Sequence, residues 1–144
     1  MSTEANKTLV RRLVEEGINE SNEALFLDLL SPEVVIHNAG PGAPSGRAGW
    51  NVYRKLFRAA FPDGRWAIAD IVAEGDLVAA RASFSGTHQG EFLGIPPTGR
   101  QVTVSAIYIC RLVDGKIVER WANSDELGML RQLGAIPAPE QVAA

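Results

Sequence analysis

One carboxylate in the chain stands where it could move protons. Asp125 follows a stretch of strand character that carries Trp121, and it precedes a short apolar helix. We expect its carboxyl group to project toward indole and aliphatic walls, where a carboxylate is partly stripped of water and becomes a stronger base. Such a group can remove a proton from a carbon beside a carbonyl and later return one. Asp at the start of a helix is also a common N-cap, so both roles stay open.

The two histidines are candidate partners for that carboxylate. Apolar residues occupy every second position from Val78, and continuing the alternation puts His88 on the buried face of a strand. A neutral imidazole there could hydrogen-bond a substrate carbonyl or orient Asp125, or it could be an ordinary core histidine. His37 ends an earlier strand beside a loop rich in Gly and Pro, where its ring could meet the rim of a substrate. For the neighbouring Asn38, ordinary loop hydrogen bonding is the expectation.

Aromatic side chains recur at helical or strand spacing and form the third group of candidates. They could stack on a flat aromatic ligand or pack into the core. In a hollow fold the two roles overlap, because the core that faces inward is also the wall of the pocket. The aromatic residues that we expect to contact a substrate are Trp50, Tyr53, Phe57, Phe92, Tyr108 and Trp121.

Metal, nucleic-acid and membrane chemistry find little support in the composition. Cys110 is the single cysteine, so no intramolecular disulfide can form, and one thiol with two histidines makes no zinc set at a recognisable spacing. The formal net charge is -3, and the basic residues occur in small groups typical of solvated helix faces. We therefore expect neither a nucleic acid nor a membrane as partner.

A length of 144 residues predicts a single domain over 1–144, with 136–144 as a loose tail. About 70% of the surface of the unfolded chain is buried at this size, which is enough for a core without disulfides or metals. The N-terminus has neither an apolar signal core nor an Arg-rich transit pattern, and no stretch reaches the roughly 18 apolar residues of a spanning helix. A cytoplasmic location is the default expectation.

The hydrophobic period changes along the chain from helical in the first 61 residues to alternating afterwards. Asp114-Gly115 is the best two-residue hairpin signal. Helices followed by long antiparallel strands predict an α+β fold, with the helices covering one face of a strongly bent sheet. The predicted helices are 4–19, 22–30 and 47–61, and the predicted strands are 34–38, 65–73, 77–87, 100–113 and 116–123.

Several motifs along the second half resemble a known family. Residues 86–100 read GTHQGEFLGIPPTGR, residues 114–121 read DGKIVERW, and residues 125–134 read DELGMLRQLG. Together with Phe61-Pro62-Asp63 at the end of the third helix, they are similar to the SnoaL-like polyketide cyclase family. The resemblance covers roughly residues 5–136, nearly the whole chain.

The resemblance implies a cone-shaped fold of the nuclear transport factor 2 type, with a mostly antiparallel sheet that encloses a pocket. It further implies a homodimer or homotetramer that closes a ring by intramolecular aldol condensation, on a small hydrophobic or aromatic carbonyl compound, without metal or cofactor. The family's catalytic Asp lies three residues before the Gly of Gly-x-x-Arg-Gln-Leu-Gly and eleven residues after the Asp of the hairpin turn. Both spacings identify Asp125. In the cyclases we associate a pocket histidine with the position three residues before the Asp of the hairpin turn. In this chain that position is occupied by Arg111.

Three functions are therefore compared. The first is a cofactor-independent cyclase or isomerase with Asp125 as base and then acid, assisted by His88 and His37. The second is a non-catalytic binding or oligomerisation module, in which Asp125 is only a cap. The third is an epoxide hydrolase of the same cone type, which ranks lowest because the sequence contains no Arg-x-Asp tripeptide.

Overall fold

The computed structural model describes residues 2–37 and 45–137. Three helical segments, a first strand and a long helix come before four consecutive strands and a short final helix. In chain order the elements are α1 (Thr3–Arg12), the π-helical turn η1 (Leu13–Ile18), α2 (Glu23–Asp28), β1 (Leu30–Ile36), α3 (Gly46–Ala60), β2 (Arg65–Glu74), β3 (Leu77–Thr87), β4 (Gln101–Val113), β5 (Lys116–Ser124) and α4 (Glu126–Gln132).

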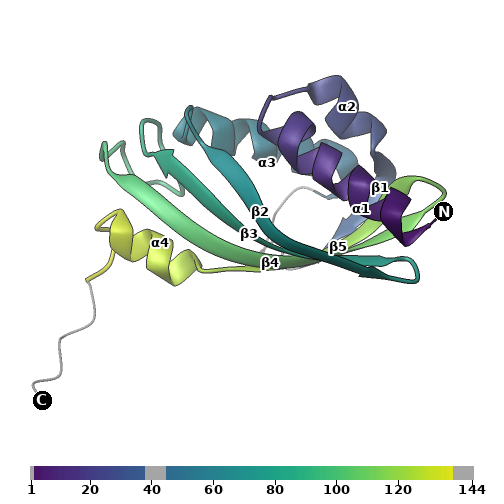
Figure 1. Cartoon of the computed structure of the whole chain (residues 1–144). Helices are drawn as coiled ribbons and strands as arrows, with labels where there is room; N and C mark the ends of the chain where they lie inside the picture. The colour runs from purple at the N-terminus through teal and green to yellow at the C-terminus, as the bar shows by residue number, and fades with distance from the viewer. Residues whose placement is uncertain (1, 38–44, 138–144) are drawn as a thin grey trace, which may run out of the picture.

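The five strands form one mixed sheet in the order β1-β5-β4-β3-β2. β1 runs parallel to β5, and the other neighbouring pairs are antiparallel. The sheet is strongly curved, and α1, α2 and α3 all lie over one of its faces (Figure 1). We call the face under these helices the inner face and the opposite one the outer face. The expected α+β architecture is confirmed.

Alternation along the central strands puts the core on the inner face. In β3 and β4 the even-numbered residues are buried and most odd-numbered residues are at least partly exposed, as a period of two requires. Two groups of buried side chains result. The larger lies between the sheet and α1, η1 and α2, around Val10, Phe26 and Ile117. The smaller, around Phe61 and Phe84, lies where α4 and the end of α3 meet the sheet.

Two side-chain amides attach helical segments to free strand edges. Asn19, directly after η1, accepts a hydrogen bond from the backbone N–H of Trp66 and donates to its carbonyl, both at 2.8 Å. Gln132 at the end of α4 does the same for Thr103, at 2.7 and 2.9 Å. Each amide therefore substitutes for a missing strand at the sheet edge, where backbone groups would otherwise lack partners.

The four predicted strands from residue 65 onward are confirmed within one residue, and Asp114-Gly115 forms the expected turn with positive φ at both residues. The first predicted helix is present, but its last part is a π-helix in which the Asn19 N–H donates to the Val14 carbonyl. The second begins at the expected cap, Asn22, and ends at Asp28 rather than at Leu30. It is shorter because Leu30 already pairs with β5 as the first residue of β1.

The third predicted helix corresponds to α3, and the strand predicted for 34–38 begins earlier, at Leu30. Asn38 and most of the predicted tail, 138–144, lie outside the described residues. Among residues 2–37 and 45–137, no helix combines the length and the apolar character needed to cross a membrane.

Replacing Asn19 by Ala removes both hydrogen bonds to Trp66 and leaves edge backbone groups of β2 without partners. We expect the free energy of unfolding to fall by about 2 kcal/mol, measured by urea denaturation. Asn123→Ala is the matched control, since Asn123 is exposed and its side chain has no hydrogen bond within residues 2–37 and 45–137. Equal stability of the two variants would contradict the proposed role of Asn19.

Candidate active site

A bulge in β5 determines which of its side chains face the helices. Arg111 of β4 pairs with Glu119, but the next residue, Leu112, pairs with Ile117, so that Val118 is an extra residue in β5. An extra residue shifts the alternation by one position. Ile117 is buried on the inner face, and after the bulge it is Arg120 that points inward, while Glu119 points outward.

The inward side chain of Arg120 lies among aromatic rings. Its guanidinium carbon is 4.8 Å from the ring centroid of Trp50, on α3, and 5.2 Å from that of Tyr108, on β4. Arg120 pairs across the sheet with Cys110, which is buried. Arg120 itself is only half-buried, so its position is recessed but still reached by solvent. We call Arg120, Trp50 and Tyr108 the inner-face cluster.

Desolvation dominates the electrostatics of the inner-face cluster. Burial lowers the pKa of Arg120, and it raises the pKa of Tyr108 to about 12 and that of Cys110 to about 11. All three shifts favour the uncharged form, as removal from water does. Tyr53, which is 52% exposed and stacks on Phe57, borders the inner-face cluster. Desolvation, followed by the nearby Glu126 carboxylate, raises the pKa of Tyr53, and Arg120 acts in the opposite direction.

Asp125 lies at the junction of β5 and α4, as the N-cap of that helix. Its Oδ1 accepts a hydrogen bond of 2.9 Å from the backbone N–H of Gly128, and its own N–H donates to the carbonyl of Ser105. The residue is exposed and borders an open hollow of about 480 Å³ on the outer face, together with Arg81 and Asn123. The expectation that the Asp125 carboxylate is enclosed by indole and aliphatic walls was therefore wrong.

His88 and Phe92 belong to the smaller core group. Nδ1 of His88 accepts a hydrogen bond from the backbone N–H of Thr98 at 3.2 Å and lies 3.0 Å from its hydroxyl, which assigns the ring proton to Nε2. The ring is completely buried at 5.5 Å from Phe61, and Phe61 is also 5.5 Å from Phe92. His88 thus anchors the segment before β4 and lies apart from the inner-face cluster.

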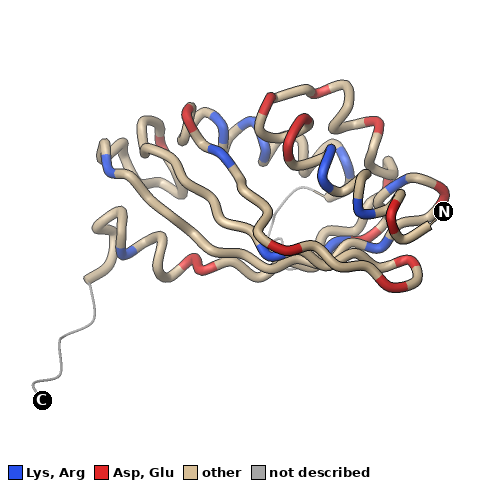
Figure 2. The backbone as a smooth tube through the Cα atoms, viewed as in Figure 1, with Lys and Arg blue, Asp and Glu red and all other residues tan. Residues whose placement is uncertain are grey.

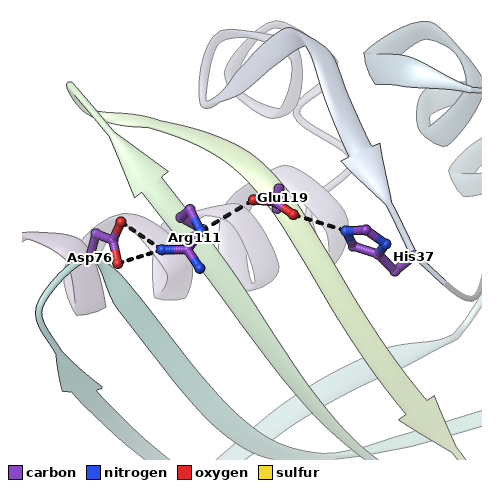
Figure 3. Close-up of polar contacts among 4 residues, drawn as sticks. All are labelled: His37, Asp76, Arg111 and Glu119. Carbon is purple, nitrogen blue, oxygen red and sulfur yellow. Dashed lines mark hydrogen bonds and ion pairs between the residues drawn. The ribbon is translucent and has the colours of Figure 1, made fainter.

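A chain of polar contacts crosses the outer face (Figure 3). Arg111 donates to both oxygens of Asp76, at 2.9 and 2.8 Å, and to Glu119 at 3.2 Å. The other oxygen of Glu119 lies 2.9 Å from Nε2 of His37. The ring of His37 stacks on Trp121 with centroids 4.8 Å apart and planes 7° from parallel. Arg111 therefore faces outward and ties the β2–β3 turn to β5.

Apart from Asp125 at the β5–α4 junction and Phe57, which packs against the smaller core group, the structure divides the predicted site residues into three groups. Trp50, Tyr53 and Tyr108 come together on the inner side of the sheet, next to Arg120. His37 and Trp121 form a stack on the outer face, and His88 and Phe92 are in the core. Arg120 was missed because its place in the alternation depends on the bulge, which no residue type announces. Figure 2 shows acidic and basic positions interspersed along the helices and turns, so the charge pattern alone does not identify Arg120 as a site residue.

Comparison with known proteins gives a consistent assignment. The model of the SnoaL-like polyketide cyclase family matches residues 8–133. Aklanonic acid methyl ester cyclase DnrD of Streptomyces peucetius is 33% identical, with 97% of each chain covered. Nogalonic acid methyl ester cyclase of Streptomyces nogalater is 33% identical over 81% of this chain and 84% of its own. The crystal structure of IdmH from Streptomyces antibioticus is 39% identical, with a TM-score of 0.79, and covers 90% of this chain and 98% of that one.

The similarity to solved structures confirms the expected cone-shaped fold of the nuclear transport factor 2 type. The predicted homodimer or homotetramer and the predicted cytoplasmic location stay predictions.

His37→Phe tests the outer-face chain, because Phe keeps a ring against Trp121 but removes the hydrogen bond to Glu119. The hydrogen bond from His37 is the main reason why the pKa of Glu119 lies below its ordinary value of 4.5. The charge of Arg111 lowers this pKa as well, to a smaller extent. We expect the pKa to rise toward 4.5 in the variant, measured by NMR titration of the Glu119 side-chain carboxyl.

A lowered pKa contributes stability that is present above the unfolded-state pKa and is lost as the pH falls through the folded-state pKa. The unmodified protein should therefore lose more stability on acidification from about pH 7 to about pH 3 than His37→Phe does. Identical titration of Glu119 in both proteins would contradict the assigned hydrogen bond.

Proposed function

The chain belongs to the SnoaL-like polyketide cyclase family and is an enzyme of the cyclase or isomerase type, and from this premise we propose that it closes a ring in an aromatic polyketide ester by intramolecular aldol condensation. The substrates in the names of its relatives, aklanonic acid methyl ester and nogalonic acid methyl ester, define the class of compound. The observation that carries the proposal is the inner-face cluster together with Tyr53, because aromatic walls around a recessed cation suit a flat molecule with polar oxygens.

The proposed reaction conserves every atom of the substrate. A base removes a proton from a carbon beside a carbonyl, and the electron pair moves onto the carbonyl oxygen as an enolate. The enolate carbon then attacks a second carbonyl carbon of the same molecule, which forms the ring bond and an alkoxide. The alkoxide takes back one proton, so the product is an isomer of the substrate and neither an oxidant nor a reductant is consumed.

Asp125 is the proposed base and later acid. Asp125 directly follows β5, the strand that carries Arg120. Besides desolvation, the carboxylate of its neighbour Glu126 raises the pKa of Tyr53, on α3, so this end of β5 lies close to Tyr53. Only Oδ1 is engaged in capping α4, and Oδ2 has no hydrogen bond among residues 2–37 and 45–137. Because Asp125 borders the outer-face hollow, the proposal requires the substrate to extend from the inner-face cluster past the end of β5 to this free oxygen. It gives His88 no part because His88 is enclosed in the core.

Two substitutions separate catalysis by Asp125 from capping by Asp125. Asn is as good an N-cap as Asp, whereas Ala cannot cap. We expect Asp125→Asn to keep the stability of the unmodified protein within a few tenths of a kcal/mol and to lose about 10²-fold to 10⁴-fold in kcat. Asp125→Ala should lose the same activity and, in addition, about 1 kcal/mol of stability. Turnover of aklanonic acid methyl ester and urea denaturation are the two measurements.

Asn22→Ala is the control for the cap, because Asn22 caps α2 with the same geometry, through a 3.2 Å bond from Leu25 N–H. It should lower stability by about 1 kcal/mol with little change in kcat. If Asp125→Asn turns over the ester at the rate of the unmodified protein, Asp125 is only a cap and the base lies elsewhere.

A further inference from the structure

Arg120 is a partly buried cation that has no acidic partner among the residues that the structure describes. Within residues 2–37 and 45–137 no carboxylate or carbonyl accepts a hydrogen bond from its guanidinium, whose contacts are the rings of Trp50 and Tyr108. The acidic groups that act on its pKa are Cys110, Tyr108 and Tyr53, and all of them are uncharged at neutral pH. The sequence of residues 38–44 contains no Asp or Glu.

The other inward or partly buried arginines contrast with this arrangement. Arg54 is bound by Asn51 and Glu23, and Arg58 donates to four backbone carbonyls. Arg111 is held between Asp76 and Glu119. Oxygen atoms therefore bind the donors of Arg54, Arg58 and Arg111, whereas Arg131 has a buried Nε without a partner among the described residues. Arg120 differs from the first three, and it lies in the inner-face cluster, where the proposed substrate would bind.

The aromatic contacts do not compensate fully for the charge. A cation–π contact is weaker than the cost of withdrawing a guanidinium ion from water. Two such contacts therefore leave part of the desolvation cost uncompensated, in agreement with the lowered pKa of Arg120. A negatively charged oxygen atom bound to the guanidinium would compensate the remaining desolvation cost, since charge-assisted hydrogen bonds are about twice as strong as neutral ones.

The hydroxyl of Tyr108 supplies a second, independent observation. Tyr108 is only 6% exposed, and its hydroxyl is buried without a hydrogen-bond partner among residues 2–37 and 45–137. Its pKa of about 12 keeps the phenol protonated at neutral pH, so it remains a donor. Buried hydroxyl groups without a partner are uncommon in folded proteins. Two unused donors thus occur in one inner-face cluster, on the adjacent strands β4 and β5.

We propose that Arg120, with the hydroxyl of Tyr108, binds the substrate carbonyl oxygen that becomes the enolate oxygen during ring closure, while Trp50 packs against the flat ring system. This rests on the proposed function for the reaction. The binding of an anionic oxygen by Arg120 stands independently of it. In this arrangement Arg120 meets the charge that develops on the oxygen as the proton leaves carbon, and its donors are already in place.

The decisive experiment compares two probes of nearly the same shape, anthraquinone-2-carboxylate and the neutral anthraquinone-2-carboxamide, by isothermal titration calorimetry. The unmodified protein should prefer the carboxylate by about tenfold or more, the usual effect of hydrogen bonds to a charged group. Arg120→Met should remove this preference while the carboxamide binds as before, and Arg120→Lys should keep part of it. Tyr108→Phe should reduce the preference without abolishing it.

Arg81→Met is the matched control, because Arg81 is an exposed arginine beside the outer-face hollow. It should leave both affinities unchanged. With aklanonic acid methyl ester, Arg120→Met should lower kcat by about 10²-fold to 10³-fold. Circular dichroism would verify that each variant is folded, and Arg120→Lys and Tyr108→Phe provide the comparison if Arg120→Met does not fold.

The inference is overturned if the unmodified protein binds both probes equally or if the preference survives in the folded Arg120→Met or Arg120→Lys variant unchanged. Loss of the preference in Arg81→Met would overturn it as well, because the probe would then lie on the outer face. A preference that depends on Arg120 without turnover of the ester would instead leave the anion site intact and refute the proposed reaction.

Discussion

The extra residue in β5 is the constraint on which the arrangement of the site depends. Without a bulge at Val118, regular alternation from the buried Ile117 would carry Glu119 and Trp121 inward and turn Arg120 toward the outer face. Because of the bulge, the Arg120 cation points to the inner face, whereas Glu119 and Trp121 point to the outer face. One inserted residue therefore determines the sign of the charge under the helices, and it separates the inner-face cluster from the polar chain around Arg111.

The rest of the fold holds that cluster in place. α3 brings Trp50 over the sheet, and β4 contributes Tyr108 from the strand beside β5. Arg58, near the end of α3, binds the carbonyls of Ile18 and Asn19, and Asn19 in turn binds the edge of β2. These hydrogen bonds connect α3 to the sheet through η1, so the helix that carries Trp50 has little freedom to move away. Preorganised donors of this kind are what electrostatic catalysis requires.

The sequence predicted the elements well and the site only in part. Alternation in β3 and β4 and the helical spacing of the aromatic residues in α3 correctly predicted the strands and the helix, because these patterns depend on residues near one another in the chain. The same alternation failed in β5, where a bulge follows from pairing with distant strands. The bulge places Trp121 on the outer face, where it stacks on His37, so neither ring lines the inner face. The N-cap role considered for Asp125 is confirmed, but its distance from the core depends on the β5–α4 junction and cannot be inferred from its sequence neighbours.

The central claim is that an aromatic carbonyl compound binds under the helices with an oxygen on Arg120. A crystal structure of the protein with anthraquinone-2-carboxylate tests this most directly. We expect electron density for the rings beside Trp50, with a carboxylate oxygen at hydrogen-bonding distance from the guanidinium of Arg120. Density confined to the outer-face hollow beside Asn123, or an Arg120 side chain paired with a carboxylate of its own chain, would contradict this claim.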